Sequence, residues 1–187
     1  MQLFCPQSVF LFNRQNQKTM SYLEADLEHI SRMGRAKEAE NMRFRSFLKF
    51  QDDGVVDRIV GKINAEVVAV IDCTLCGNCC KDLRPCLEAE EITRLSSLEN
   101  LPEKEFSEKY TERDEDENCF CLKDAPCRYL EDKKCRIYED RPGNCRSYPY
   151  THLPGFSTRG FFMVYNYGEC PIVYNVMERL KQAMRFR

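Results

Sequence analysis

Apolar residues recur at helical spacing through the first third of the chain. They are Leu23, Leu27, Ile30, Met33, Met42, Phe44, Phe47, Leu48 and Phe50, with charged residues between them. Apolar positions three or four residues apart lie on one face of a helix. The pattern therefore predicts a helix from Ser21 to about Phe50, with Gly34 as a weak point inside it.

A second apolar series follows the turn that Asp52-Asp53-Gly54 predicts. Its members are Val56, Ile59, Val60, Ile63, Val67 and Val70, again three or four residues apart. Valine would also suit a strand, but this period favours a helix that runs into Asp72. The two helices together predict an N-terminal helical hairpin over residues 20–71.

The rest of the chain has shorter patterned segments. Short helices are expected at residues 87–95 and 102–110, a solvated charged loop at 112–118, and a closing helix at 171–184. Aromatic and branched residues predict short strands at 120–123 and 161–167. The predicted fold class is α+β and mostly helical, with an irregular cysteine-rich lobe over residues 72–187.

Cysteine dominates this second region, because eleven of the twelve cysteines lie between Cys73 and Cys170. Four of them form the run Cys73-Thr-Leu-Cys76-Gly-Asn-Cys79-Cys80. Thiolates at this spacing on a tight loop can converge on one inorganic centre, and Gly77 allows the backbone to fold tightly there. Adjacent side chains point apart, so Cys80 is expected to reach a different ligand group from Cys79.

A disulfide framework is the alternative, and it needs an oxidising compartment. The first twelve residues lack a basic segment and a cleavage site, and no apolar run approaches the ~20 residues of a membrane helix. We therefore expect a cytoplasmic protein with reduced thiols, metal ions as its partners and no membrane association. Residues 1–19 have no apolar periodicity and are interpreted as an unstructured or non-native extension, which leaves Cys5 out of the site.

Charge and histidine content narrow the chemistry. The net charge of −2 gives no general footprint for nucleic acid, and nothing in the sequence identifies a protein partner. With only His29 and His152, any metal site must be ligated mainly by thiolates. No credible Ser/His/Asp set or glycine-rich nucleotide loop is present, and the radical S-adenosylmethionine spacing fails because Leu83 stands where its third cysteine would be.

The distal cysteines have characteristic neighbours: Pro126-Cys127, Cys135-Arg-Ile-Tyr, Asn144-Cys145-Arg-Ser-Tyr-Pro and Cys170-Pro171. With the first run, they resemble the CxxCxxCC (YkgJ-like) cysteine-cluster family, described as zinc- or iron-chelating domains, from about Asp72 to Pro171. The resemblance implies a metal site formed by Cys73, Cys76, Cys79, Cys80, Cys127, Cys135, Cys145 and Cys170. It leaves Cys86 as a substitute or supporting ligand, and Cys119 and Cys121 outside the pattern.

The spacing favours an iron–sulfur cluster over zinc. Four-cysteine zinc sites usually use two separated pairs, whereas C-x2-C-x2-C with a later Cys-Pro is similar to a bacterial ferredoxin run. A [4Fe-4S] cluster on Cys73, Cys76 and Cys79 is expected, with Cys170 as a candidate fourth ligand. Cys80 is then expected to turn towards Cys127, Cys135 and Cys145.

Two function classes follow from these features. The first is a metal-chelating module without a defined catalytic activity, in which the centre organises an irregular lobe. The second is a redox or methyl-transfer enzyme, because the family extends to flagellin lysine methylases. A redox pair of Cys73 and Cys76 stays possible, although the additional clustered cysteines favour ligation. Arg136, Arg141 and Arg146 either donate hydrogen bonds to sulfur or form surface salt bridges.

Overall fold

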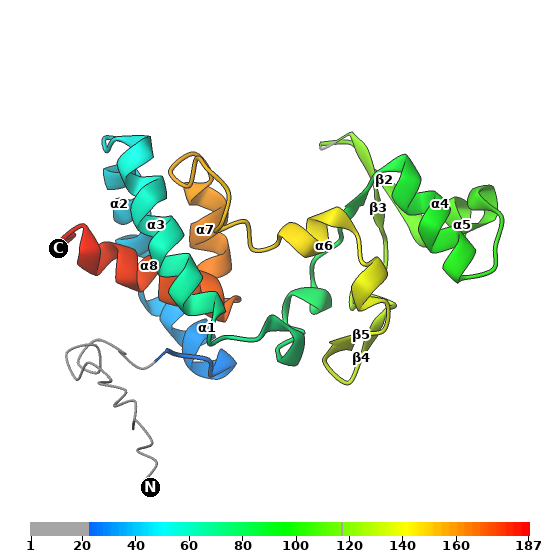
Figure 1. The fold of residues 1–187 in the computed structure, drawn as a ribbon, viewed down its shortest axis with the longest axis horizontal. Helices are drawn as coiled ribbons and strands as arrows, with labels where there is room; N and C mark the ends of the chain where they lie inside the picture. The colour runs from blue at the N-terminus through cyan, green and yellow to red at the C-terminus, as the bar shows by residue number, and fades with distance from the viewer. Residues whose placement is uncertain (1–22, 117) are drawn as a thin grey trace, which may run out of the picture.

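The computed structural model describes residues 23–116 and 118–187, so the expectations for residues 1–19 and Cys5 lie outside the described residues. The molecule is elongated, with a helical bundle at one end and a smaller helix-and-sheet body at the other (Figure 1). Cysteine-rich turns lie between the two bodies. This arrangement is mostly helical α+β, as the sequence predicts.

Five helices form the larger body: α1 (Leu27–Ala36), α2 (Glu38–Leu48), α3 (Asp53–Val68), α7 (Gly160–Tyr167) and α8 (Pro171–Ala183). Helix α8 packs against α3, and α7 packs against α2. Their apolar faces make one core that includes Phe44, Val60 and Val176. Helices from both ends of the chain therefore share this core, on either side of the boundary expected at residue 72.

The single first helix of the sequence prediction is wrong in its bounds, because it is two helices that begin later. Asp26 caps α1, since its carboxylate accepts hydrogen bonds from the amides of Glu28 and His29 at 2.9 and 3.3 Å. Lys37 separates α1 from α2 with the non-helical dihedrals φ −106° and ψ 11°. The predicted hairpin stays a prediction, because α3 packs mainly against α8 from the other end of the chain.

The strand predicted at residues 161–167 is also wrong, because this segment is helix α7. Met163 and Tyr167, four residues apart, are buried in the larger core, whereas Phe161 and Tyr165 are exposed. This burial follows a helical period rather than the alternation of a strand. The aromatic composition suggested a strand, and packing against α2 and α8 decided for a helix.

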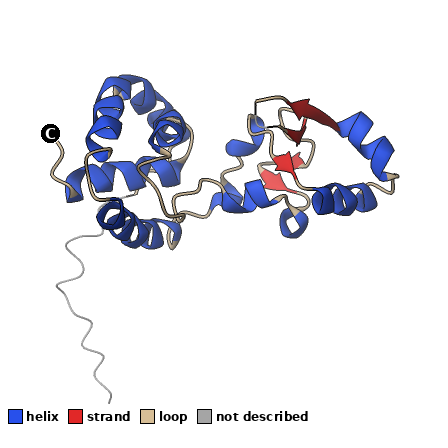
Figure 2. Cartoon of the chain, turned by 90° about the horizontal axis from the view of Figure 1, so that it is seen from above, coloured by secondary structure: helices blue, strands red, loops and turns tan. Residues whose placement is uncertain are grey.

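The smaller body contains helices α4 (Ala89–Leu98) and α5 (Glu103–Tyr110) and an antiparallel sheet of order β1-β3-β2 (Figure 2). The strands are β1 (Cys86–Leu87), β2 (Thr111–Asp114) and β3 (Cys119–Leu122). Leu95, Phe106 and Leu122 are buried in a second core. The charged segment 112–118 was predicted as a loop, but its first residues belong to β2 because they pair with β3.

The segments between the bodies are short. They are the turns η2 (Cys73–Leu75), η3 (Cys79–Lys81) and η4 (Tyr138–Asp140), the hairpin of β4 (Leu130–Glu131) with β5 (Lys134–Cys135), and helix α6 (Gly143–Ser147). All of these segments except η4 carry a cysteine, and η4 lies between Cys135 and Cys145 in the sequence. They place the thiols at the junction of the two cores.

Candidate metal centre

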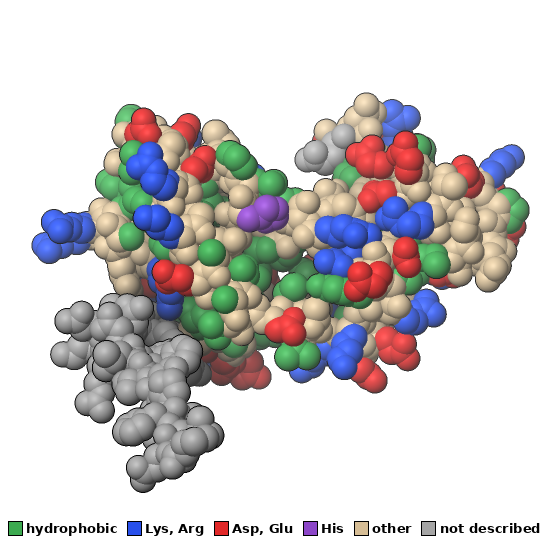
Figure 3. Space-filling view, in the orientation of Figure 1, with side chains coloured by type: hydrophobic (Ala, Val, Ile, Leu, Met, Phe, Trp, Pro, Cys, Tyr) green, Lys and Arg blue, Asp and Glu red, His purple; other side chains and the backbone are tan. Residues whose placement is uncertain are grey.

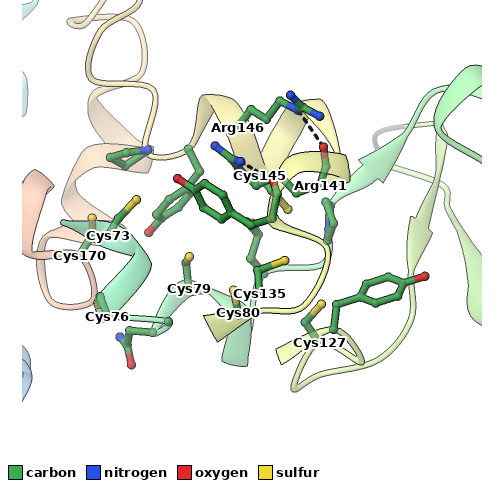
Figure 4. A pocket seen from close by; sticks show the side chains of 18 of the residues that line it. Cys73, Cys76, Cys79, Cys80, Cys127, Cys135, Arg141, Cys145, Arg146 and Cys170 are labelled. Carbon is green, nitrogen blue, oxygen red and sulfur yellow. Dashed lines mark hydrogen bonds between the residues drawn. The ribbon is translucent and has the colours of Figure 1, made fainter. Parts of the chain in front are cut away.

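One pocket lies at this junction, and all eight predicted ligands line it: Cys73, Cys76, Cys79, Cys80, Cys127, Cys135, Cys145 and Cys170 (Figure 4). They come from η2, η3, β5, α6, the segment before β4 and the start of α8. Residues almost one hundred positions apart in sequence are therefore brought to one cavity.

The first cysteine loop is fixed by local contacts. The Asp72 carboxylate caps η2 and accepts hydrogen bonds from the Thr74 amide at 2.9 Å and its hydroxyl at 2.7 Å. Gly77 has φ +61°, and a β-carbon there would overlap the backbone of Lys133 in the β4–β5 turn. The tight turn expected at Gly77 is present, and its close approach to the hairpin explains why glycine is needed.

The distal cysteines are held by both bodies. The Cys127 amide donates a hydrogen bond to the Cys80 carbonyl at 2.7 Å. Cys127 and Cys135 pack against the core of the smaller body. Cys170 precedes the first residue of α8 and is buried in the core of the larger body, with 7% of its surface exposed. The pocket wall is thus shared between two separate cores.

A first group of thiols gathers towards the larger body. In Figure 4, Cys73 and Cys170 lie together with Cys76 below them. Burial raises the pKa of Cys170 to about 11, and the neighbouring Cys76 adds to the rise. Burial raises the pKa of Cys73, and the charges of Asp72 and Cys76 raise it further. Cys76 therefore lies within electrostatic range of both Cys73 and Cys170.

A second group gathers towards the smaller body. Burial raises the pKa of Cys145 to about 12, and Cys127, Cys80 and Cys135 all add to it. Burial likewise raises the pKa of Cys127, with contributions from Cys80 and Cys135. Each of these four thiols therefore lies close enough to the others to oppose a further negative charge.

The vicinal pair lies at the boundary of the two groups. Cys79 and Cys80 share a hydrogen bond, which raises the pKa of Cys79 and lowers that of Cys80 to about 7. The Cys79 thiol is influenced by Cys170 of the first group and Cys145 of the second. Cys80 itself acts on the distal thiols rather than facing solvent.

The thiols surround the pocket instead of converging on a point. Within residues 23–116 and 118–187, no three His, Cys, Asp or Glu side chains are arranged to hold a single metal ion. Thiolates are soft ligands that suit zinc and iron–sulfur clusters, so the chemistry of the donor set fits either. The distances between the sulfurs, unlike their chemistry, depend on the size of the group that they bind.

The arginines hold the pocket backbone. Arg141 lines the pocket, stacks 3.6 Å above the Tyr138 ring and donates to the Tyr138 carbonyl. The Arg146 Nε donates to the Arg141 carbonyl at 2.9 Å. Arg136 lies over the Tyr129 ring. Among the described residues none of the three pairs with a carboxylate or donates to a sulfur, and Arg141 and Arg146 donate to backbone carbonyls instead. Burial raises the pKa values of Cys73 and Cys145, and the Arg141 charge opposes both rises.

Cys86 is not a supporting ligand in this structure, because it forms a disulfide with Cys119. The pairing of β1 with β3 turns its side chain towards the sheet and away from the pocket, which Cys86, Cys119 and Cys121 do not line. Nearness in sequence to Cys80 suggested that Cys86 is a ligand, but the register of β1 against β3 determines the direction of the Cys86 side chain.

Comparison with protein families agrees with this arrangement. Residues 72–171, more than half of the chain, match the family model described as "CxxCxxCC: Putative zinc- or iron-chelating domain". The chain belongs to this family. Neither a comparison with curated proteins nor one with solved structures gave a match to this chain. The resemblance inferred from the cysteine run and its distal neighbours is thereby confirmed.

Two further expectations concern surfaces. None of the described helices is both long enough and apolar enough to cross a bilayer. On the face seen in Figure 3, acidic and basic side chains are interspersed, with apolar side chains between the two bodies. The absence of a nucleic-acid partner stays a prediction.

Proposed function

We propose that the protein binds iron–sulfur clusters, with [4Fe-4S] favoured, through two sets of four thiolates. The first set is Cys73, Cys76, Cys79 and Cys170. The second set is Cys80, Cys127, Cys135 and Cys145. The supporting observation is that all eight thiols line one pocket, where Cys127, Cys80 and Cys135 influence Cys145 and Cys76 influences Cys170.

The choice of a cluster over zinc rests on spacing and size. Sulfurs around a zinc ion all lie within ~2.3 Å of it and therefore close together. An iron–sulfur cluster is a larger body, so its thiolates stand further apart. Thiols that are spread around a pocket, with no single-ion arrangement among the described residues, are favourable to the larger group.

Purification without oxygen tests this choice. We expect a brown protein with broad visible absorbance, containing iron and acid-labile sulfide. Stoichiometric zinc without iron or sulfide, in protein made with sufficient iron, would show that the pocket is a zinc site.

Substitution tests the two sets separately. Cys79→Ser and Cys145→Ser each remove one ligand from a different set, so each variant should lose about half of the bound iron and become less soluble. Cys5→Ser is the control and should change neither. Loss of all iron in one variant, with full retention in the other, would indicate a single centre with satellite thiols.

The enzyme alternative is favoured by one feature. Cys73 is exposed, and it lines both the pocket and a neighbouring cleft of about 440 Å³ that Arg146 and His152 also line. A centre next to an open cleft could exchange electrons with a substrate there. Reversible bleaching of the visible absorbance by dithionite is expected for this role, and a spectrum that does not respond to reductant would exclude redox chemistry.

The proposed location is the cytoplasm. Its support is the number of unpaired thiols at one pocket, since such thiols persist and bind metal in reducing compartments. Metal analysis of the protein isolated from a cytosolic fraction would test this, and recovery only from an oxidising compartment would contradict it.

A further inference from the structure

Three cysteines outside the pocket gather on one face of the sheet. Cys119 and Cys121 are two residues apart on β3, so their side chains point to the same side. Cys86 on β1 stands directly opposite Cys121 in the strand register. Its bond to Cys119 shows that all three sulfurs share this face.

Cys86 can reach either partner. Its Cα lies 5.8 Å from that of Cys119, within the usual range for a disulfide. Directly opposed residues in an antiparallel pair have Cα atoms ~4.5–5.5 Å apart, which is also within that range. The register therefore gives Cys86 two alternative disulfide partners without movement of the strands.

The three sulfurs differ in access. The Cys86–Cys119 disulfide is half-buried, whereas Cys121 has 1% of its surface exposed. The Cys121 thiol donates a hydrogen bond to the Glu112 carbonyl at 3.7 Å, and burial raises its pKa. An external thiol can therefore reach the disulfide, whereas the buried Cys121 thiol is accessible only to the neighbouring protein sulfurs.

We infer that Cys86, Cys119 and Cys121 form a thiol–disulfide exchange site, separate from the eight pocket thiols. In the internal step the Cys121 sulfur, as thiolate, attacks the Cys86 sulfur. A Cys86–Cys121 bond forms, the Cys86–Cys119 bond breaks, and Cys119 leaves as thiolate and takes up the proton that Cys121 lost. No oxidant is needed for this exchange.

Opening of the site needs an external thiol reductant such as glutathione. Two glutathione molecules supply two electrons and two protons to the disulfide and become oxidised glutathione, which leaves two protein thiols. Disulfides inside reducing cells are usually transient and redox-active. The half-buried position of this bond suits that behaviour better than a permanent staple.

The exchange site shares backbone with the metal pocket. Pro85 and Leu122, the neighbours of Cys86 and Cys121, line the pocket, and the Leu122 amide donates to the Pro85 carbonyl at 3.2 Å. Asn144, next to Cys145, donates a hydrogen bond to the Cys86 carbonyl at 3.4 Å. The redox state of the sheet therefore acts on one wall of the pocket.

The test equilibrates the full chain, purified with its metal, in buffers of graded reduced-to-oxidised glutathione ratio. After acid quenching, thiols and former disulfides are labelled with two different alkylating reagents and located by mass spectrometry. We expect a Cys86–Cys119 disulfide at the oxidised end and two free thiols at the reduced end. Finding both residues as thiols at every ratio would overturn the inference.

Two variants test the exchange itself. In Cys119→Ser, Cys86 should pair with Cys121, whereas Cys121→Ser should keep the Cys86–Cys119 bond. An unpaired or glutathionylated Cys86 in Cys119→Ser would refute the exchange. Metal content is measured in parallel, and loss of a whole metal equivalent in Cys121→Ser would instead make the three cysteines a metal site. Disulfide mapping does not depend on which metal fills the pocket, so this inference and the proposed function can fail separately.

Discussion

Replacement of Gly77 by alanine tests the structural basis of the cysteine loop. Gly77 has φ +61° and lies between Cys76 and the vicinal pair. An alanine β-carbon there would overlap the carbonyl oxygen, the carbonyl carbon and the Cα of Lys133. These are backbone atoms of the β4–β5 turn, so a side-chain rotation cannot relieve the overlap.

Two costs add to give the expected loss. A left-handed conformation costs an alanine ~1–2 kcal/mol relative to glycine. Overpacking against a fixed neighbour costs a further ~1–3 kcal/mol. The sum, ~2–5 kcal/mol, is a large part of the ~5–15 kcal/mol that stabilises a typical domain. Because the loop and the hairpin carry thiols of both sets, bound metal should fall together with stability.

The assay is urea unfolding followed by circular dichroism, with iron and zinc measured on the same anaerobic samples. Gly61→Ala is the matched control, because its β-carbon would have nothing within 4 Å and α3 should gain ~0.5–1 kcal/mol. Gly77→Asn separates the two costs, since asparagine tolerates the left-handed region but keeps the overlap. A Gly77→Ala protein with full metal content and less than ~1 kcal/mol of destabilisation would refute the reasoning.

Two further substitutions test the larger body. Gly34→Ala should lower the free energy of unfolding by ~1–3 kcal/mol, because its β-carbon would lie 2.6 Å from the Gly168 Cα. Thermal unfolding measures this loss, and a midpoint temperature equal to that of Gly61→Ala would contradict the close approach. Glu178→Gln should cost ~1–3 kcal/mol, because it weakens a partly buried network in which Glu178 accepts hydrogen bonds from Lys37, Lys181 and Tyr167 at 2.6–2.9 Å. Burial opposes the charged form of Glu178, but the lysine hydrogen bonds outweigh it and hold its folded pKa below the ordinary value of 4.5. The stability that the network contributes is therefore present above pH 4.5 and is lost as the pH falls through the folded pKa of Glu178. The free energy of unfolding should accordingly depend less on acid pH in Glu178→Gln than in the wild type. The exposed control Glu66→Gln should cost at most ~1 kcal/mol and keep the acid dependence of the wild type.

Local features of the sequence were enough to predict the tight turn at Gly77 and the cysteines that line the pocket. The divergence of vicinal side chains predicts that Cys79 and Cys80 serve different ligand sets. This stays a prediction, because the two thiols share a hydrogen bond in the structure. The demand for glycine at position 77 could also be expected from the tight turn. The hairpin backbone that Gly77 meets could not, because this contact joins segments more than fifty residues apart.

Nonlocal packing explains the predictions that were wrong. The segment from Phe161 to Tyr167 has aromatic and branched residues typical of a strand, and the core formed by α2 and α8 made it a helix. The direction of the Cys86 side chain depended on the register of β1 against β3, which a strand of two residues cannot reveal. Composition describes a segment by itself, whereas both outcomes were decided by its partners.

The location of the pocket gives the proposed metal centres a structural role besides any chemistry. Cys170 belongs to the core of the larger body, whereas Cys127 and Cys135 pack against the core of the smaller one. The two cores are separate clusters of buried residues, and the segments that join them at the junction are short turns. Thiolate ligation can supply ~10–16 kcal/mol of apparent binding free energy in a small domain, which exceeds what such turns can contribute by packing. Ligands drawn from both sides would therefore couple the two bodies. The vicinal pair would be central to that coupling, because Cys79 is influenced by Cys170 on one side and by Cys145 on the other, and Cys80 influences Cys145.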